Sequence, residues 1–237
     1  MVYLFDYHKK DYYMKLLSLF FLIVSNTTCA FNAEQFWTQE YNKRHDYPHV
    51  ASASGPGSDL VQTKVLIDTL PHLFRKFCIS SVLDLPCGDF YWMKAVDKSA
   101  LYKYIGADII APLIHENQCN YATEKVQFIH ANGTSDELPK VDLIICRDCL
   151  VHLSNNDIIA MLTNFKKSGA KYLLVTTFPG RTNQSIPTGG WQPLNLQGAP
   201  FNFPNPLIII NEQCTEQDGI YADKSMGLWK LEDILVN

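Results

Sequence analysis

The chain has 237 residues, of which 47% are hydrophobic and 19% charged, a composition typical of a globular protein that excludes a wholly disordered chain. The formal net charge is −4 at pH 7, and Lys and Arg form only short clusters. The sequence therefore gives no sign of the basic surface that nucleic-acid binding requires, and we expect no nucleic acid partner.

Residues 1–30 are predicted to form a hydrophobic leader similar to a signal peptide. Lys15 precedes the apolar run 16–24 (LLSLFFLIV), and small or polar residues follow it up to Ala30, where cleavage would fit. The run is shorter than the roughly 20 apolar residues needed to cross a bilayer. The alternative is an apolar helix that packs on the domain or engages a membrane. The sequence thus leaves the location open: exported if the leader is a signal peptide, otherwise cytoplasmic or membrane-associated.

Residues 31–237 are predicted to form one domain in which strands and helices alternate. Polar residues with aromatic residues at intervals predict a helix at 33–44, and the Gly- and Ser-rich stretch 52–58 predicts a loop. Apolar residues spaced by three and four predict a helix from 59 to 73. The next helices are predicted at 90–96, 112–121 and 154–167, the last of them capped by Ser154 with Asp157 three residues on.

Short apolar runs between these helices predict strands at 81–85, 104–108, 126–130, 141–146 and 171–178. Such a pattern predicts a parallel sheet covered by helices on both faces. The stretch 180–206 is rich in Pro, Gly and Asn and predicts a long irregular segment, with closing strands at 207–211 and 228–231.

Polar residues follow three of the predicted strands at the edge where ligands bind in open parallel sheets. Asp84 begins the segment DLPCGD after the first strand, and Asp108 ends the second strand 24 residues later. An acidic residue about 20 residues beyond such a loop can bind ribose hydroxyls. Gly88 permits a close approach of the backbone, and Asp84 and Asp89 can line a site for a cation. Phe90, Ile109 and Ile110 can cover a flat base.

The segments LDLPCGDFYWM, YIGADI, VDLIICRDCLVHLS, KYLLVTTF and LNLQGAPFNFP resemble class I S-adenosylmethionine-dependent methyltransferases over roughly residues 35–235. The resemblance implies a Rossmann-like three-layer α/β/α sandwich with a mostly parallel seven-stranded sheet and an antiparallel C-terminal strand. It also implies S-adenosylmethionine as the cofactor. The residues that would bind it are Asp84, Pro86, Cys87, Gly88, Asp108, Ile109, Asn132 and Arg147, with Gly55 in an entrance loop.

By the same resemblance, Arg147 and Asp148 would lie at the methionine end of the cofactor. His152 and Asp148 are the candidates for a catalytic base, since histidine suits proton transfer near neutral pH. We expect the irregular segment to form a substrate lid that carries Trp191, Asn195, Phe201 and Phe203. The acceptor would offer an O, N or S nucleophile on a small molecule or a protein.

Two alternatives remain open from the sequence. A nicotinamide-dependent oxidoreductase would carry G-x-G-x-x-G after the first strand, and this chain does not. A non-catalytic binding protein could keep the same fold as a scaffold. The scaffold alternative is favoured by the loop after the first strand, which has the single glycine Gly88 where the family usually carries several glycines. We expect no metal site, because Cys146 and Cys149 form the only C-x-x-C pair and a second ligand pair at suitable spacing is missing.

Overall fold

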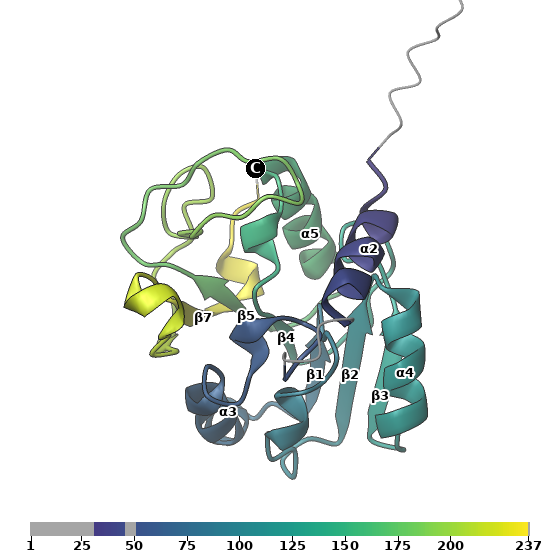
Figure 1. Ribbon diagram of the computed structural model, residues 1–237. Helices are drawn as coiled ribbons and strands as arrows, with labels where there is room; N and C mark the ends of the chain where they lie inside the picture. The colour runs from purple at the N-terminus through teal and green to yellow at the C-terminus, as the bar shows by residue number, and fades with distance from the viewer. Residues whose placement is uncertain (1–30, 46–50, 237) are drawn as a thin grey trace, which may run out of the picture. The chain divides into compact units, whose positions relative to one another are not determined.

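The computed structural model describes residues 31–45 and 51–236 (Figure 1). The predicted leader, residues 1–30, lies outside the described residues, so its role stays a prediction. The chain divides into two compact units, residues 1–32 and 33–237, and the second unit forms the fold. Of the helices in the described ranges, none has the length and apolar character needed to span a membrane.

A seven-stranded mixed sheet forms the centre of the fold, in the order β3-β2-β1-β4-β5-β7-β6. Its strands are β1 (Ser81–Asp84), β2 (Lys103–Asp108), β3 (Val126–His130), β4 (Leu143–Cys146), β5 (Tyr172–Thr177), β6 (Ile208–Asn211) and β7 (Ser225–Lys230). Strands β1 to β5 pair in parallel, whereas β7 runs antiparallel to both of its neighbours, β5 and β6. This confirms the predicted sheet, with its antiparallel strand near the C-terminus.

Helices cover both faces of the sheet and give the predicted three layers (Figure 1). α3 (Lys64–Lys76) and α4 (Ala111–Tyr121) pack on one face, and α5 (Asn155–Lys167) packs on the other. Every residue of β1 and β4 is buried, as expected for central strands covered on two sides. The N-terminus of α5 has the predicted cap, because the Ser154 hydroxyl accepts a hydrogen bond from the Asp157 amide.

Two predicted helices differ from the structure. The segment 90–96 forms only a short 3-10 helix, Met93–Ala95. Phe90 has a left-handed φ of 58°, which ends any regular helix there, and its ring packs 5.3 Å from Tyr104 and 5.1 Å from Phe128. The helix predicted from 59 begins instead at Lys64, because the Asp59 carboxylate accepts the amides of Val61 and Gln62 and holds a turn.

Candidate functional site

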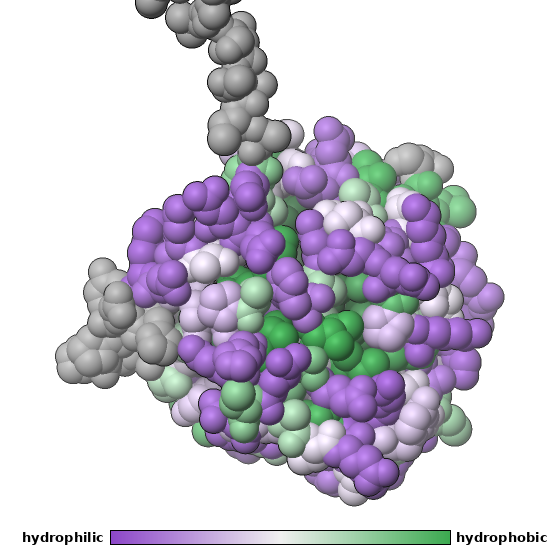
Figure 2. Space-filling view, turned by 90° about the vertical axis from the view of Figure 1, so that its right-hand side faces the viewer, coloured by the Kyte–Doolittle hydropathy of each residue, from purple (hydrophilic) through white to green (hydrophobic). Residues whose placement is uncertain are grey.

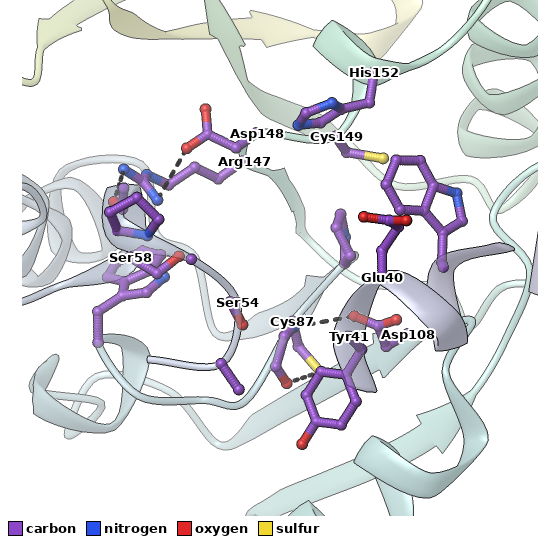
Figure 3. Close-up of a pocket in the computed structure, with 18 of the residues that line it drawn as sticks. Glu40, Tyr41, Ser54, Ser58, Cys87, Asp108, Arg147, Asp148, Cys149 and His152 are labelled. Atoms are coloured by element: carbon purple, nitrogen blue, oxygen red, sulfur yellow. Dashed lines mark hydrogen bonds and ion pairs between the residues drawn. The ribbon is translucent and has the colours of Figure 1, made fainter. Parts of the chain in front are cut away.

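A cavity of about 450 Å³ lies at the carboxyl ends of β1, β2 and β4. Figure 3 shows Tyr41 and Asp108 on one side of this space and Asp148 and His152 on the other. The sheet order reverses between β1 and β4, and ligands of open α/β sheets bind at this point. The lining includes eight of the nine residues predicted to bind the cofactor: Gly55, Asp84, Pro86, Cys87, Gly88, Asp108, Ile109 and Arg147.

The loop after β1 is held in a fixed conformation by contacts with its neighbours. The Gly88 amide donates to Asp108 Oδ2 over 3.1 Å, and Asn117 Nδ2 donates to the Gly88 carbonyl over 2.8 Å. Gly88 has a φ of 54°, in the left-handed region that glycine adopts without strain. Gly88 therefore adds no side chain to the cavity lining, and Ser54 fills the space that a Cβ would need.

Two buried carboxyl groups stand side by side at the ends of β1 and β2. Burial raises the pKa of Asp84 to about 7, although its hydrogen bond from the Tyr104 hydroxyl at 2.6 Å acts in the other direction. Burial likewise raises the pKa of Asp108 to about 6, against the effect of the amides of Ile110 and Gly88 that it accepts. Carboxyl groups with raised pKa values in one cavity are typical of functional sites.

The entrance loop is held closed over the loop after β1 by Asp89. The Asp89 carboxylate accepts the Ser52 hydroxyl at 2.9 Å, the Ala53 amide at 2.7 Å and the Ser54 hydroxyl at 3.0 Å. Ser54 Oγ in turn accepts the Asp89 amide at 2.9 Å. We expected Asp89 to line the site, but it is not among the lining residues and anchors the entrance loop instead.

Helix α2 (Ala33–His45) contributes residues that the sequence did not assign to the site. Trp37, Glu40 and Tyr41 line the cavity, and the Tyr41 hydroxyl donates to Glu116 Oε2 over 3.1 Å. Tyr41 also packs with Ile110 and other apolar residues. Trp37 and Tyr41 are four residues apart, so a helix places them on one face. This spacing in the sequence could have predicted that both side chains face the same site.

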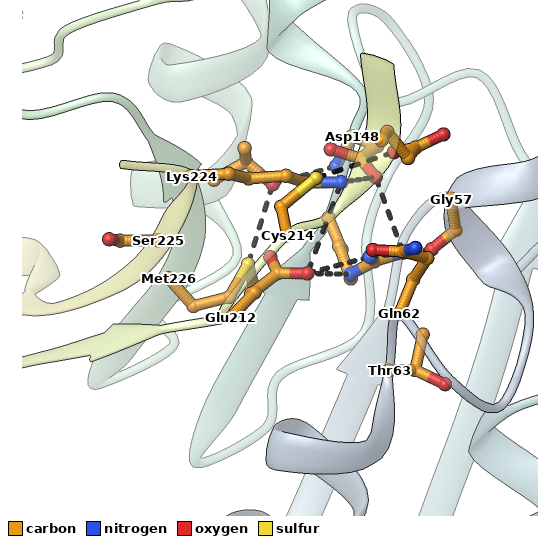
Figure 4. Close-up of polar contacts among 12 residues, drawn as sticks. Gly57, Gln62, Thr63, Asp148, Glu212, Cys214, Lys224, Ser225 and Met226 are labelled. Atoms are coloured by element: carbon orange, nitrogen blue, oxygen red, sulfur yellow. Dashed lines mark hydrogen bonds and ion pairs between the residues drawn. The ribbon is translucent and has the colours of Figure 1, made fainter. Parts of the chain in front are cut away.

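A buried ion-pair network closes the far end of the cavity (Figure 4). Arg147 Nη2 lies 2.7 Å from Glu212 Oε2 and donates to the Gly57 carbonyl over 2.8 Å. Arg147 Nη1 lies 3.2 Å from Asp148 Oδ2, and Lys224 Nζ lies 2.6 Å from the same oxygen. Glu212 and Lys224 were not predicted, because they lie more than 60 residues from Arg147 in the chain.

Asp148 is ionised and held in an uncommon backbone conformation. Although burial opposes ionisation, the positive charges of Arg147 and Lys224 keep its pKa below the ordinary value. Its φ is 52°, and its amide donates to the Thr176 hydroxyl over 2.8 Å. A non-glycine residue held by its surroundings in the left-handed region of backbone conformation is often found at functional sites.

His152 faces the same cavity with a defined tautomer. Its Nδ1 lies 2.9 Å from the Gly190 carbonyl oxygen, and its ring stands edge-on to Trp37 with centroids 5.6 Å apart. A carbonyl oxygen can only accept, so Nδ1 carries the proton in the neutral ring. Nε2 then has a lone pair, which is what a general base requires.

An aromatic group forms part of the cavity wall. Trp191 comes from the irregular segment, and its ring lies 4.8 Å from Tyr221 and 6.2 Å from Phe178. All three side chains line the cavity, and Trp191 is 42% exposed. The irregular segment therefore does reach the site, through Trp191.

Three predicted site residues do not line the cavity. Asn132 Oδ1 accepts the amide and hydroxyl of Thr134, so its side chain stabilises a turn. Asn195 is buried inside the irregular segment, where its Nδ2 donates to the Arg181 carbonyl. Phe203 packs in the core, 5.3 Å from Trp229. Phe90 and Phe201, also expected near the ligands, are buried outside the cavity lining. A local turn thus holds the Asn132 side chain, whereas residues more distant in the chain hold Asn195 and Phe203.

The described residues offer no candidate metal centre: within 31–45 and 51–236, no three His, Cys, Asp or Glu side chains are grouped so that they could hold an ion.

Comparison with known proteins agrees with this geometry. Residues 82–169, which run from β1 to the end of α5, match the family model of the methyltransferase domain. The region from β1 to the end of α5 is therefore a methyltransferase domain. No curated protein sequence matches this chain.

Solved structures share the fold of this chain. A methyltransferase from Anabaena variabilis, described as S-adenosylmethionine-dependent, aligns with a TM-score of 0.58 at 14% identity, over 84% of this chain and 95% of its own. Human N-acetylserotonin methyltransferase aligns with a TM-score of 0.56 at 15% identity, over 86% of this chain and 61% of its own. The chain spans less than two thirds of the length of several matched structures, the human enzyme among them.

Proposed function

We propose that this protein binds S-adenosylmethionine in the cavity and transfers its methyl group to an O, N or S nucleophile of a small-molecule or protein acceptor. The observation that carries the proposal is the pairing of Gly88 with Asp108 across the ends of β1 and β2. Bare backbone and a carboxyl group there match what an adenosyl ligand requires, which is close approach and an acceptor for ribose hydroxyls. The human relative was solved in complex with S-adenosylmethionine, which supports the same cofactor here.

The residues of the cavity fit this cofactor. Asp108 uses each carboxyl oxygen for one amide, and each oxygen keeps a lone pair for a ribose hydroxyl. Tyr41, Ile109 and Leu113 give apolar cover for a flat base. Asp84 would face the positively charged end of the ligand. When bound, S-adenosylmethionine supplies an activated methyl group on its sulfonium.

The protein would then act mainly by alignment of the acceptor with that methyl group. Holding two reactants in line is worth up to about 7–11 kcal/mol of the barrier. His152 would take the proton that the acceptor loses at Nε2, which is the ring nitrogen that carries no proton when Nδ1 donates to the Gly190 carbonyl. Asp148, which faces the same space, would orient the acceptor.

Two measurements test the proposal against a binding scaffold without activity. Calorimetry with S-adenosylmethionine should give saturable binding at one site. Incubation with methyl-labelled cofactor and a fractionated lysate should then place the label on an acceptor. Absence of cofactor binding would overturn the proposal, and binding without any transfer would favour the scaffold.

A further inference from the structure

The acceptor end of the cavity has a surplus of negative charge and aromatic walls. It is formed by His152, Trp37, the aromatic group Phe178, Trp191 and Tyr221, and the ion-pair network described above. We infer that the acceptor is a flat aromatic compound whose nucleophile is a nitrogen bearing a hydrogen, bound through Asp148 Oδ1. The inference rests on the proposed function and names the acceptor class for that same site.

The charges at this end disfavour an acidic acceptor. Two basic side chains, Arg147 and Lys224, stand against three acidic ones, Asp148, Glu212 and Glu216, so the formal sum is −1. Every guanidinium nitrogen of Arg147 contacts Glu212, Asp148 or the Gly57 carbonyl. A carboxylate or phosphate on the acceptor would therefore meet no unpaired cation among the described lining residues.

Asp148 offers one open acceptor atom beside the base. The ion pairs that it makes with Arg147 and Lys224 both use Oδ2, and Oδ1 accepts no hydrogen bond from the described residues. The side chain is 30% exposed, so a ligand can reach it. His152 and Asp148 both line the cavity, and Figure 3 shows them on the same side of it.

The charge that develops during transfer separates nitrogen from oxygen acceptors. An amine nitrogen becomes positive as its lone pair forms the bond to the methyl carbon and the S–CH₃ electron pair returns to sulfur. The nitrogen then gives its proton to His152 Nε2, which leaves the N-methylated acceptor and S-adenosylhomocysteine. The Asp148 carboxylate stabilises the positive nitrogen, whereas it would oppose the negative charge of a deprotonated phenol. A neutral N–H donor also suits an open carboxylate oxygen.

The aromatic walls define the shape of the acceptor. Trp191 and Tyr221 meet at 4.8 Å with their planes 66° apart, and Trp37 stands edge-on to His152. Aromatic rings in offset or edge-to-face contact add about 0.5–1.5 kcal/mol per pair beyond burial. A flat ring that carries the nitrogen would therefore be held between these side chains.

Three compounds with one ring system test the inference: 5-aminoindole, 5-hydroxyindole and indole-5-carboxylate. Their affinities are measured by calorimetry on the full chain saturated with S-adenosylhomocysteine. We expect 5-aminoindole to bind at least about tenfold more tightly than indole-5-carboxylate. Asp148→Asn should lower the affinity for 5-aminoindole about tenfold, as for loss of a hydrogen bond to a charged group. Asp68→Asn, at an exposed position on α3, is the matched control and should change neither value.

The outcomes keep the two proposals apart. If S-adenosylhomocysteine itself does not bind, the proposed function fails. If it binds but 5-aminoindole binds no tighter than indole-5-carboxylate, or if methyl-labelled cofactor labels 5-hydroxyindole in preference to 5-aminoindole, the acceptor inference is overturned and the proposed function stands. Retained affinity of Asp148→Asn for S-adenosylhomocysteine shows that the variant is folded, and an unchanged preference for the amine in that variant also overturns the inference.

Discussion

The Gly88 amide donates to Asp108 Oδ2 over 3.1 Å, and this hydrogen bond ties the end of β1 to the end of β2. Asp108 accepts a second amide, that of Ile110, through its other carboxyl oxygen. The carboxyl group is thus fixed in direction before any ligand arrives. Such pre-organisation lowers the entropic cost of binding.

Asp108→Asn should weaken S-adenosylmethionine binding by about tenfold or more. The asparagine side chain has one acceptor oxygen where aspartate has two, and it lacks the negative charge that strengthens the hydrogen bonds of the carboxylate. Calorimetry measures the change. Asp97→Asn alters an exposed carboxylate that does not line the cavity and serves as the control. An unchanged dissociation constant in the Asp108 variant would remove the basis for the assigned cofactor site.

Asp84→Asn should stabilise the fold at pH 8 while it weakens cofactor binding. The pKa of Asp84 is raised from 3.8 to about 7 in the folded protein, so its ionisation there costs up to about 4 kcal/mol. The protonated Asp84 carboxyl group contributes its full stabilisation of the fold below pH 3.8, and this stabilisation is lost as the pH rises through 7. The gain from the substitution should therefore grow between pH 4 and 7 and level off above. Urea unfolding across this range tests the trend, and a gain independent of pH would contradict it.

The raised pKa values of Asp84 and Asp108 also predict how cofactor affinity depends on pH. Both groups lose their negative charge as the pH falls through about 7 and about 6. A positively charged ligand that bonds to these carboxylates should bind progressively more weakly from pH 8 to pH 5.5. Calorimetry at several pH values checks this, and affinity that rises toward pH 5.5 would exclude the two carboxylates as partners.

Gly88→Ala should displace the entrance loop. A Cβ at this position would lie 2.1 Å from Ser54 Oγ, and the φ of 54° is strained for alanine. Gly180→Ala is a matched control, since Gly180 has a φ of 80° but open space around it. Both variants should lose roughly 1 kcal/mol of stability from backbone strain. Only Gly88→Ala should also lose cofactor affinity, and equal affinities in the two variants would refute the role of the close contact.

His152→Gln should slow methyl transfer by roughly 10²–10⁴-fold, the usual contribution of a general base. Cofactor affinity should stay the same, because His152 lies at the acceptor end of the cavity. His115→Gln, at an exposed position on α4, is the control. The turnover number with a saturating acceptor is the measurement, and a variant with full turnover would show that His152 moves no proton.

The periodic features of the sequence were sufficient to predict most of the fold. Short apolar strands between helices predicted the parallel sheet, and the Ser154 cap predicted the start of α5, because these signals depend on residues close together in the chain. The segment 90–96 was predicted wrongly as a helix, since the packing of Phe90 on Tyr104 and Phe128 involves β2 and β3. Local pattern carries no information about such contacts.

The sequence by itself determined the order of the strands along the chain, the loop after β1 and the carboxyl groups that follow β1 and β2. Only the tertiary structure decided that Asp89 anchors the entrance loop and that Glu212 and Lys224 join Arg147 and Asp148. The physical reason is distance along the chain. A strand end is specified by its own few residues, whereas a buried ion pair is specified by how separate segments fold onto each other.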